Sequence, residues 1–385
     1  MSTPLQVRLL HYGIETMFLA PKQALPPVIW GVPGCAKTAI MKEIAERGSY
    51  HLEHVTVSDR NPEDIGGTPM VTGEFMRRYP PDFVWGAKAA NERGQKAVIF
   101  VDEMTTAQPP QQAPLMRGFH ECKWGDSQLD RGMTAVAGAA NPPELAANGS
   151  ELASALANRC FHISWPPFDT SVRTAWKLQG ESVVDTLPRV DPELFQEKLK
   201  LAQAHICAFL TARPSLKNSD PLKAAGQGYG QFASDRMWDA FEALYATCMC
   251  VKDEEAISGC AEGTLGGGIG LEFSAWLTDM DLPDPEDVLA GKAEIPADKA
   301  RADRTFAALL ALVAAATQQR PAKEYSQRWH KSWEQMDKVM HLGKDIIVVP
   351  GRVLSRNQPS GGLKPEVQKI IAKLTGVVRE AGMLR

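Results

Sequence analysis

The chain has 385 residues, of which 44% are hydrophobic and 23% charged, a usage typical of a globular protein with two or three domains. Its 42 basic and 46 acidic side chains leave a formal charge of −4, so we expect no general attraction to nucleic acid or to an anionic membrane. The seven cysteines are scattered, no apolar run exceeds 11 residues and the N-terminus lacks a signal-peptide layout, which favours a cytoplasmic protein without disulfides, zinc or a membrane span.

The first part of the chain alternates predicted strands and helices. Apolar residues at helical spacing predict a helix over 5–19, and another that follows a glycine-rich stretch and ends at Gly48. A short helix capped by Asn61 precedes a hairpin that turns at Thr72-Gly73, and a further helix begins at Asp82. The strands are predicted at 27–30, 51–58, 97–101, 134–140 and 161–163. This alternation predicts a three-layer α/β domain with a parallel sheet over residues 1–167.

Beyond residue 167 the pattern becomes helical. We expect a helical domain at 168–284 and a C-terminal helical extension at 285–385. The glycine-rich stretch 266–270 has no strand before it and no Lys-Ser/Thr after it, so it is interpreted as a loop. The predicted helices lie at 192–213, from the cap Ser234 onward, at 271–277, at 302–317, around Trp329 and Trp333, and at 365–381.

The stretch Gly31–Thr38, "GVPGCAKT", matches the phosphate-loop pattern G-x-x-x-x-G-K-[ST] except at Ala36, which stands where glycine is usual. In such a loop the backbone N–H groups face phosphate, Lys37 would reach the β- and γ-phosphates, and Thr38 would ligate Mg²⁺. The alternative is a glycine-proline turn that happens to precede Lys-Thr. Because the residue before the lysine opens a helix, we expect alanine there to be tolerated and to stiffen the end of the loop.

Two carboxylates follow the apolar run at 97–101. Asp102 and Glu103 stand about 65 residues after Lys37, where the first could coordinate Mg²⁺ and the second could activate water. The alternative is that the pair only begins a solvated helix. The phosphate-loop pattern upstream favours the catalytic interpretation.

Three further polar residues stand at ends of predicted elements. Asn141 follows the next strand and could hold the attacking water, although Asn-Pro is also a common turn. Arg159 precedes the fifth strand and is either an arginine finger or a surface arginine. Arg236 lies in the first turn of a helix, where the helix dipole disfavours a cation, so either a bound phosphate holds it there or it is solvated.

Six stretches in this order resemble the AAA+ ATPases, and among them the MoxR-like, dynein-related group: "GVPGCAKT", "PEDIGGTPMVTGEF", "AVIFVDEM", "VAGAANPPE", "SALANRCFHI" and "FASDRMW". The resemblance covers residues 27 to about 240. It implies a P-loop αβα domain with a helical lid, binding ATP and Mg²⁺. It assigns Asn141 as sensor 1, Arg159 as an arginine finger acting on a neighbouring subunit, and Arg236 as sensor 2. The implied Walker A residues are Gly31, Pro33, Gly34, Cys35, Ala36, Lys37 and Thr38, the Walker B residues are Asp102 and Glu103, and the Mg²⁺ ligands are Thr38 and Asp102.

The same resemblance implies an activity and partners. It predicts a ring-shaped homo-oligomer, a hexamer, that hydrolyses ATP to remodel, assemble or activate a protein client, often one with a von Willebrand factor A domain. The stretches "PMVTGEFMRR" and "KWGDSQLD" resemble the helix-2 insert and the pre-sensor-1 hairpin and are expected to contact the client. Two alternatives stay open: a DNA-acting AAA+ motor, for which only Arg77-Arg78 beside Phe75 and Tyr79 argue, and a scaffold that binds ATP without hydrolysing it.

Overall fold

The computed structural model describes residues 3–146, 149–184, 187–221, 229–360 and 363–380. The chain forms two compact units, the first made of residues 1–195 and 216–274 and the second of residues 196–215 and 275–385. The helical domain expected at 168–284 is thus divided between the two units.

The first unit contains a sheet of five parallel strands, in the order β2-β5-β8-β1-β9. All five correspond to strands predicted from the sequence, which confirms the parallel sheet. Because the strands are parallel, their C-terminal ends meet at one edge, here called the carboxyl edge, and their N-terminal ends meet at the opposite amino edge. The strands are β1 (Pro27–Trp30), β2 (His51–Thr56), β5 (Ala97–Asp102), β8 (Thr134–Ala140) and β9 (Phe161–Ser164).

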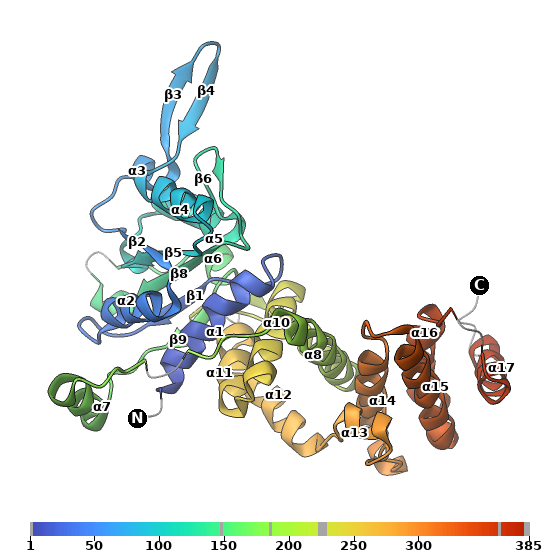
Figure 1. Cartoon of the computed structure of the whole chain (residues 1–385). Helices are drawn as coiled ribbons and strands as arrows, with labels where there is room; N and C mark the ends of the chain where they lie inside the picture. Colours follow the sequence, from blue (N-terminus) through green and yellow to red (C-terminus); the bar gives the residue numbers. More distant parts are fainter. Residues whose placement is uncertain (1–2, 147–148, 185–186, 222–228, 361–362, 381–385) are drawn as a thin grey trace. The chain divides into compact units, whose positions relative to one another are not determined.

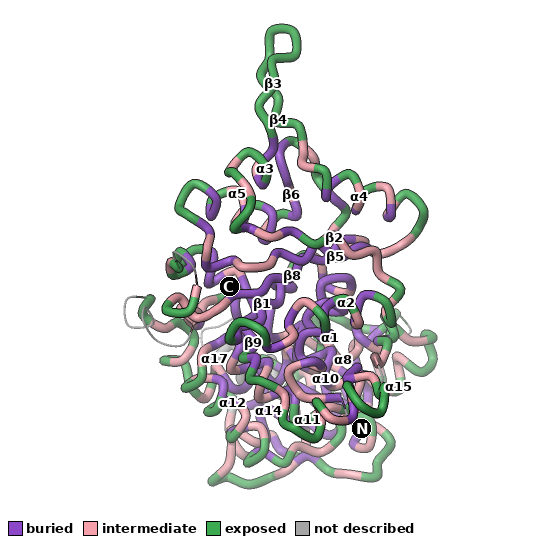
Figure 2. Tube along the Cα trace, turned by 90° about the vertical axis from the view of Figure 1, so that its left-hand side faces the viewer, coloured by how far each residue is buried: buried purple, intermediate pink, exposed green. Residues whose placement is uncertain are grey.

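Helices cover both faces of this sheet. Every residue of β8 and residues 97–101 of β5 are buried, and successive side chains of a strand point to opposite faces. Neither face can therefore be exposed to solvent, as Figure 2 also shows for the strands. The first helices pack on the sheet: α1 (Leu5–Leu19) against β1, β8 and β9, and both α2 (Lys37–Gly48) and α4 (Asp82–Glu92) against β2 and β5 (Figure 1). The expected three-layer α/β architecture is present.

Two small hairpins stand outside the central sheet, both as predicted. The first, β3 (Thr68–Thr72) and β4 (Phe75–Tyr79), follows the short helix α3 (Pro62–Gly66) and is exposed along its whole length (Figure 2). The second joins β6 (Lys123–Trp124) to β7 (Ser127–Gln128). The carboxylate of Asp126 accepts a hydrogen bond from the Arg78 N–H at 2.9 Å, so the second hairpin supports the base of the first.

The sequence interpretation was wrong at one glycine-rich stretch among the remaining helices. The stretch 266–270 is not a loop: only Gly266 has a positive φ, of 88°, and α12 begins at Gly267. A Cβ at Gly270 would lie 2.5 Å from the Glu262 nitrogen, so this glycine serves close helix packing. The predicted end of the last helix, Ala381, lies outside the described residues. The other helices are α5 (Pro109–Glu121), α6 (Ser154–Ala157), α7 (Thr170–Thr174), α8 (Pro192–Ala212), α10 (Asp235–Val251), α11 (Glu254–Leu265), α12 (Gly267–Met280), α13 (Pro285–Ala290), α14 (Ala302–Ala316), α15 (Ala322–Val339), α16 (Lys344–Arg356) and α17 (Pro365–Glu380).

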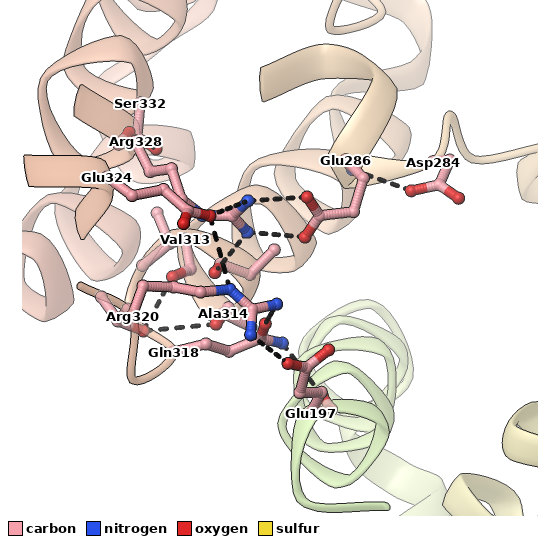
Figure 3. A network of polar contacts seen from close by, with 12 residues as sticks. Glu197, Asp284, Glu286, Val313, Ala314, Gln318, Arg320, Glu324, Arg328 and Ser332 are labelled. Atoms are coloured by element: carbon pink, nitrogen blue, oxygen red, sulfur yellow. Dashed lines mark hydrogen bonds and ion pairs between the residues drawn. The ribbon is translucent and has the colours of Figure 1, made fainter. Parts of the chain in front are cut away.

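The second unit is tied together by paired arginines (Figure 3). Arg328 on α15 donates two hydrogen bonds to the Glu286 carboxylate on α13, at 2.6 and 2.7 Å, and a third to the Ala315 carbonyl at 2.9 Å. The hydrogen bonds from Arg328 hold the pKa of Glu286 below its ordinary value. Arg320 forms an ion pair of 2.5 Å with Glu197 on α8. Each of these arginines therefore has an acidic partner in another element.

Two general expectations can be compared with the described residues. Within them, no helix combines the length and apolarity needed to cross a bilayer. All seven cysteines lie in the described part of the chain, and none forms a disulfide.

Candidate active site

The loop between β1 and α2 needs glycine at two positions. A Cβ at Gly31 would lie 2.4 Å from the Trp165 carbonyl oxygen, so no side chain fits there. Gly34 has a φ of 80°, in the left-handed region, and open space around its Cα. The indole N–H of Trp165 donates to the Cys35 carbonyl at 3.2 Å and attaches the loop to the segment after β9.

Ala36 differs from the sequence expectation. It has a φ of 65° and a ψ of 21° and lies just before α2, which begins at Lys37. A left-handed conformation costs an L-residue with a Cβ roughly 1–2 kcal/mol, whereas glycine adopts it freely. The expectation that alanine acts here as a good helix former is therefore wrong: Ala36 is a strained residue in a position that suits glycine.

Lys37 is buried and surrounded by neutral oxygens. Its Nζ donates to the carbonyls of Gly31, at 2.6 Å, and Val32, at 3.1 Å, and to Oδ1 of Asn141, at 2.8 Å. The last contact joins the loop after β1 to the end of β8, the neighbouring strand. Because none of these partners is an anion, the positive charge of Lys37 is available to a ligand such as phosphate.

Thr38 and Asp102 meet at the same edge. The Thr38 hydroxyl donates to Oδ2 of Asp102 at 2.7 Å, and His54 on β2 approaches the same oxygen at 3.4 Å. Burial alone would raise the pKa of Asp102, but hydrogen bonds from His54, Thr38 and the Glu103 N–H outweigh it and lower the pKa. The carboxylate is therefore ionised at neutral pH.

Glu103 has a constrained position directly after β5. Its φ of 59° lies in the left-handed region, and a hydrogen bond of 2.8 Å from the Thr106 hydroxyl to the Glu103 carbonyl supports this turn. Its carboxylate accepts a hydrogen bond from the hydroxyl of Ser58. The sequence interpretation missed Ser58, which is the last residue of the strand predicted at 51–58, although a polar residue at the end of a strand is the same kind of signal that pointed to Asp102.

A bound Mg²⁺ would fit this site only together with a nucleotide. Within the described ranges, no group of three or more His, Cys, Asp and Glu residues could enclose a metal ion. Thr38 and Asp102 offer one hydroxyl and one carboxylate, already turned toward each other. Mg²⁺ commonly takes one or two protein oxygens and completes its shell with water and phosphate oxygens. Such an ion would supply charge to neutralise phosphate oxygens.

A cavity of about 580 Å³ lies beside the segment after β9, and no residue of the loop lines it. It is bounded by α1, by the end of β9 and by α11, and Ser164 and Pro166 in its wall flank Trp165, which holds the loop. Tyr229, also in the wall, stacks on Trp30 with ring centroids 4.7 Å apart. Its size and its mixed polar and apolar wall suit a ring-bearing group such as a nucleoside.

Arg159 and Arg236 do not lie at the carboxyl edge. Arg159 immediately precedes β9 and so lies at the amino edge; its Nη1 donates to the Ala155 carbonyl at 2.5 Å, and its buried Nε has no hydrogen-bond partner in the described part of the chain. The Asn158 amide donates to the hydroxyl of Ser234, which precedes α10, at 3.1 Å. This bond holds the start of α10, and Arg236 with it, beside Arg159. Burial, and next the charge of Arg159, lower the pKa of Arg236.

The expected site residues therefore form two groups. The structure brings Lys37, Thr38, Asp102, Glu103 and Asn141 together at the carboxyl edge. It brings Arg159 and Arg236 together at the amino edge. Asn158, which joins the second group, was not predicted, and no pattern in the sequence distinguishes it.

Comparison with known proteins gives limited similarity. No family model matches the chain, and no curated protein sequence does either. A structure from Cytophaga hutchinsonii, named as that of a candidate ATPase, is 18% identical to this chain with a TM-score of 0.39. The match covers 68% of this chain and 83% of that one. A variant of RuvB from Thermotoga maritima is 14% identical with a TM-score of 0.28, over 73% of both chains. Likenesses of this size carry no argument about activity, which has to come from the site itself.

The fold and the loop define the class of the first unit. A glycine-rich loop joins β1 of a parallel sheet to α2, and its lysine meets the polar residue that ends β8. This is a P-loop α/β domain, and the rest of the chain is helical.

Proposed function

We propose that the chain is a MoxR-like AAA+ ATPase that hydrolyses Mg·ATP. The observation that carries this proposal is the pair of contacts at the carboxyl edge, Lys37 with Asn141 and Thr38 with Asp102. These contacts join a phosphate-binding cation, a polar amide and two oxygens suited to Mg²⁺.

Each residue has a distinct task in this proposal. Lys37 and the loop N–H groups hold the phosphates, and Asn141 orients the attacking water beside them. Glu103 accepts a proton from that water. Ser58 holds the Glu103 carboxylate before a nucleotide binds, since it is the hydrogen-bond partner of that carboxylate.

The active form in this proposal is a ring of identical chains. Arg159 lies at the amino edge and its own phosphate loop lies at the carboxyl edge, so the strands separate the two. In this proposal Arg159 therefore serves the nucleotide of another copy. An arginine finger supplied in this way contributes roughly 10³–10⁵-fold to the rate. Hydrolysis per chain should therefore rise with protein concentration. A hexamer is the assembly proposed.

We propose that the client is a protein, and a protein with a von Willebrand factor A domain is included in this proposal. The β3–β4 hairpin exposes large apolar side chains on both faces, among them Val71 at 75% and Met76 at 71%. Such exposed apolar groups are typical of surfaces that bind protein. Arg77 and Arg78, with Phe75 and Tyr79, keep single-stranded DNA as the second candidate.

A phosphate-release assay tests the enzymatic part of the proposal. We expect Lys37→Ala and Glu103→Gln each to reduce turnover by about 100-fold or more, because each removes a group that acts on the phosphates or the water. Arg159→Ala should reduce turnover as strongly without weakening ATP binding. The matched control is Arg173→Gln, a substitution of an exposed arginine on α7. Equal rates for the wild type and Glu103→Gln would instead support a scaffold that binds ATP without hydrolysing it.

A binding experiment separates the two kinds of client. The Glu103→Gln chain with ATP is tested against an unfolded model protein and against single-stranded DNA, each with and without the double substitution Val71→Ser/Met76→Ser. Loss of protein binding in the double variant is expected. Salt-dependent DNA binding that needs Arg77 and Arg78, without protein binding, would replace the protein client with DNA.

A further inference from the structure

Gln112 on α5 is buried, with an exposed fraction of 8%, and its amide makes three hydrogen bonds, all to backbone groups. Nε2 donates to the carbonyls of Ala107, at 3.2 Å, and Glu151, at 3.3 Å, and Oε1 accepts from the Ala153 N–H at 2.8 Å. Two carbonyls and one N–H fix the orientation of the amide, because only its nitrogen can donate. Gln112 therefore joins the chain between β5 and α5 to Ala153, which lies 41 residues further along.

The segment 150–153 belongs to no helix or strand. The Ser150 N–H donates to the Thr105 carbonyl at 2.8 Å, and the Ser150 hydroxyl donates to the Ala107 carbonyl at 3.0 Å. Both acceptors lie between β5 and α5, where one acceptor of Gln112 also lies. Because the segment has no regular structure of its own, these hydrogen bonds and those of Gln112 determine where it lies.

α6 begins directly after this segment and leads to Arg159. It is a single turn, and Ala153 before it has no side-chain oxygen to cap it. The Arg159 N–H donates to the Leu156 carbonyl at 3.0 Å, and its Nη1 donates to the Ala155 carbonyl at 2.5 Å. The guanidinium is thus attached to α6, and its position follows from where α6 begins.

A cavity of about 460 Å³ adjoins the same residues. Its wall contains Gln112 and Met116 of α5 and Ala155 and Leu156 of α6. Because residues of both helices line the cavity, packing between α5 and α6 is incomplete on this side. The hydrogen bonds of Gln112 therefore contribute more to the placement of α6 than they would in a closely packed interface.

We propose that Gln112 is a positioning residue for Arg159, on which it acts by holding the start of α6. This inference rests on the proposed function, in which Arg159 acts on the nucleotide of another copy. Gln112 itself needs no contact with a nucleotide, because its three hydrogen bonds go to the backbone of its own chain. A displacement of the guanidinium by about 1 Å is expected to cost roughly 100-fold in rate, because its effect on developing charge depends closely on its position.

Two substitutions of neighbouring glutamines test this inference. Gln112→Met keeps the length of the side chain and removes its three hydrogen bonds. Gln111→Met is the matched control, because Gln111 is also 8% exposed and also makes three side-chain hydrogen bonds. Its partners are the Gln108 N–H and the carbonyls of Val57 and Arg60, so it holds a different segment.

The first measurement is a double-mutant cycle with Arg159→Ala, followed with radiolabelled ATP so that low rates are resolved. In the wild-type background we expect Gln112→Met to lower kcat by about 10- to 100-fold and to change KM for ATP by less than about 3-fold, because the phosphate loop is untouched. In the Arg159→Ala background the same substitution should change kcat by less than about 2-fold, because no guanidinium is left to position. Gln111→Met should change kcat by one and the same factor in both backgrounds.

The second measurement mixes two chains. Lys37→Ala disables the phosphate loop and leaves Arg159 in place, whereas Gln112→Met leaves the loop intact. With the Lys37→Ala chain in excess, each intact loop has a neighbour with a well-placed arginine, so its rate should rise to within about 3-fold of the wild-type rate. A Gln111→Met chain mixed in the same way should gain nothing, because Gln111 holds a segment at the carboxyl edge of its own chain.

The outcomes separate this inference from the proposed function. If the wild type and Arg159→Ala hydrolyse ATP at equal rates, the proposed role of Arg159 is wrong and this inference falls with it. If Arg159→Ala is slow but Gln112→Met lowers kcat equally in both backgrounds, or not at all, or is not restored by mixing, Gln112 has only a structural role and the inference alone is overturned. Circular dichroism and ADP binding check that each variant is folded. Gln112→Glu, which keeps the acceptor for the Ala153 N–H, replaces Gln112→Met if that chain does not fold.

Discussion

Two pairs of arginines, one pair in each unit, differ in whether the chain supplies them with an acidic partner. In the second unit, Arg328 is bound by two hydrogen bonds to Glu286 and Arg320 forms an ion pair with Glu197 (Figure 3). In the first unit, Arg131 and Arg236 share a cavity and have no acidic partner in the described part of the chain. Both sets lie at places where several elements meet.

The difference indicates what each set contributes. A paired arginine has its charge satisfied by the chain and therefore stabilises the fold, by an amount that depends on how well the pair is shielded from water. An unpaired arginine in a cavity stabilises the fold little and retains its capacity to bind an anion. We therefore expect substitutions in the two sets to affect different measurements.

The largest expected effect on stability comes from His162. This basic side chain is buried as a neutral ring. Its Nδ1 accepts a hydrogen bond from Trp30 Nε1 at 2.9 Å, and its Nε2 donates to the Ala157 carbonyl at 2.8 Å. Burial lowers the pKa of His162 to about 4. Because this folded-state pKa lies below the ordinary value of about 6.5, the stabilisation is complete above that value and decreases as the pH falls toward 4, by up to roughly 3 kcal/mol.

Urea unfolding of the first unit at about pH 7.5 and about pH 4.5 measures this effect. The His162→Gln chain cannot titrate at this position, so its stability should change less with pH than that of the wild type. His205 in the second unit, whose pKa burial also lowers to about 4, stays unchanged in both chains and serves as an internal reference. Parallel pH dependences of the two chains in the first unit would show that His162 is not neutral in the folded state.

Arg328→Ala gives the next largest expected effect and is a direct test of the paired set. Removing this side chain leaves the Glu286 carboxylate without its two donors, and we expect a loss of about 1–3 kcal/mol in unfolding free energy. Arg131→Gln should change stability by no more than about 0.5 kcal/mol. Both are measured by urea denaturation of the full chain. An equal loss in the two variants would remove the distinction between paired and unpaired arginines.

Ala36→Gly gives the smallest expected effect and tests strain at the phosphate loop. Glycine relieves the left-handed conformation of Ala36 but also has a more flexible unfolded state, so we expect a net gain of up to about 1 kcal/mol. The matched control is Ala39→Gly, an exposed position inside α2, where the same change should lose about 1 kcal/mol. If both variants lose stability equally, strain at Ala36 is not the deciding factor. Thermal unfolding of the two variants gives the comparison.

Much of the first unit follows from local patterns in the sequence. Buried strands appear as continuous apolar runs, and the residue that ends such a run in a parallel sheet reaches the carboxyl edge. This rule predicted the positions of Asp102 and Asn141, and applied to β2 it would also have found Ser58. The sequence interpretation failed at residues 266–270, because the sequence does not show that Gly270 packs against α11.

The sequence by itself determined the parallel α/β fold, the phosphate loop and the residues at its carboxyl edge, because each residue is found from the strand or loop in which it stands, and parallel strands end at the same edge. Only the tertiary structure decided which strands are neighbours, that Ala36 has a left-handed backbone, and that Arg236 lies beside Arg159 rather than beside the loop. The cavity that Arg131 and Arg236 share belongs to the same class of information: its wall also contains Lys22 and His120, and the four residues are distant in sequence. No local pattern encodes their meeting, because the order of the strands and the packing of α10 on the segment before β9 bring them together.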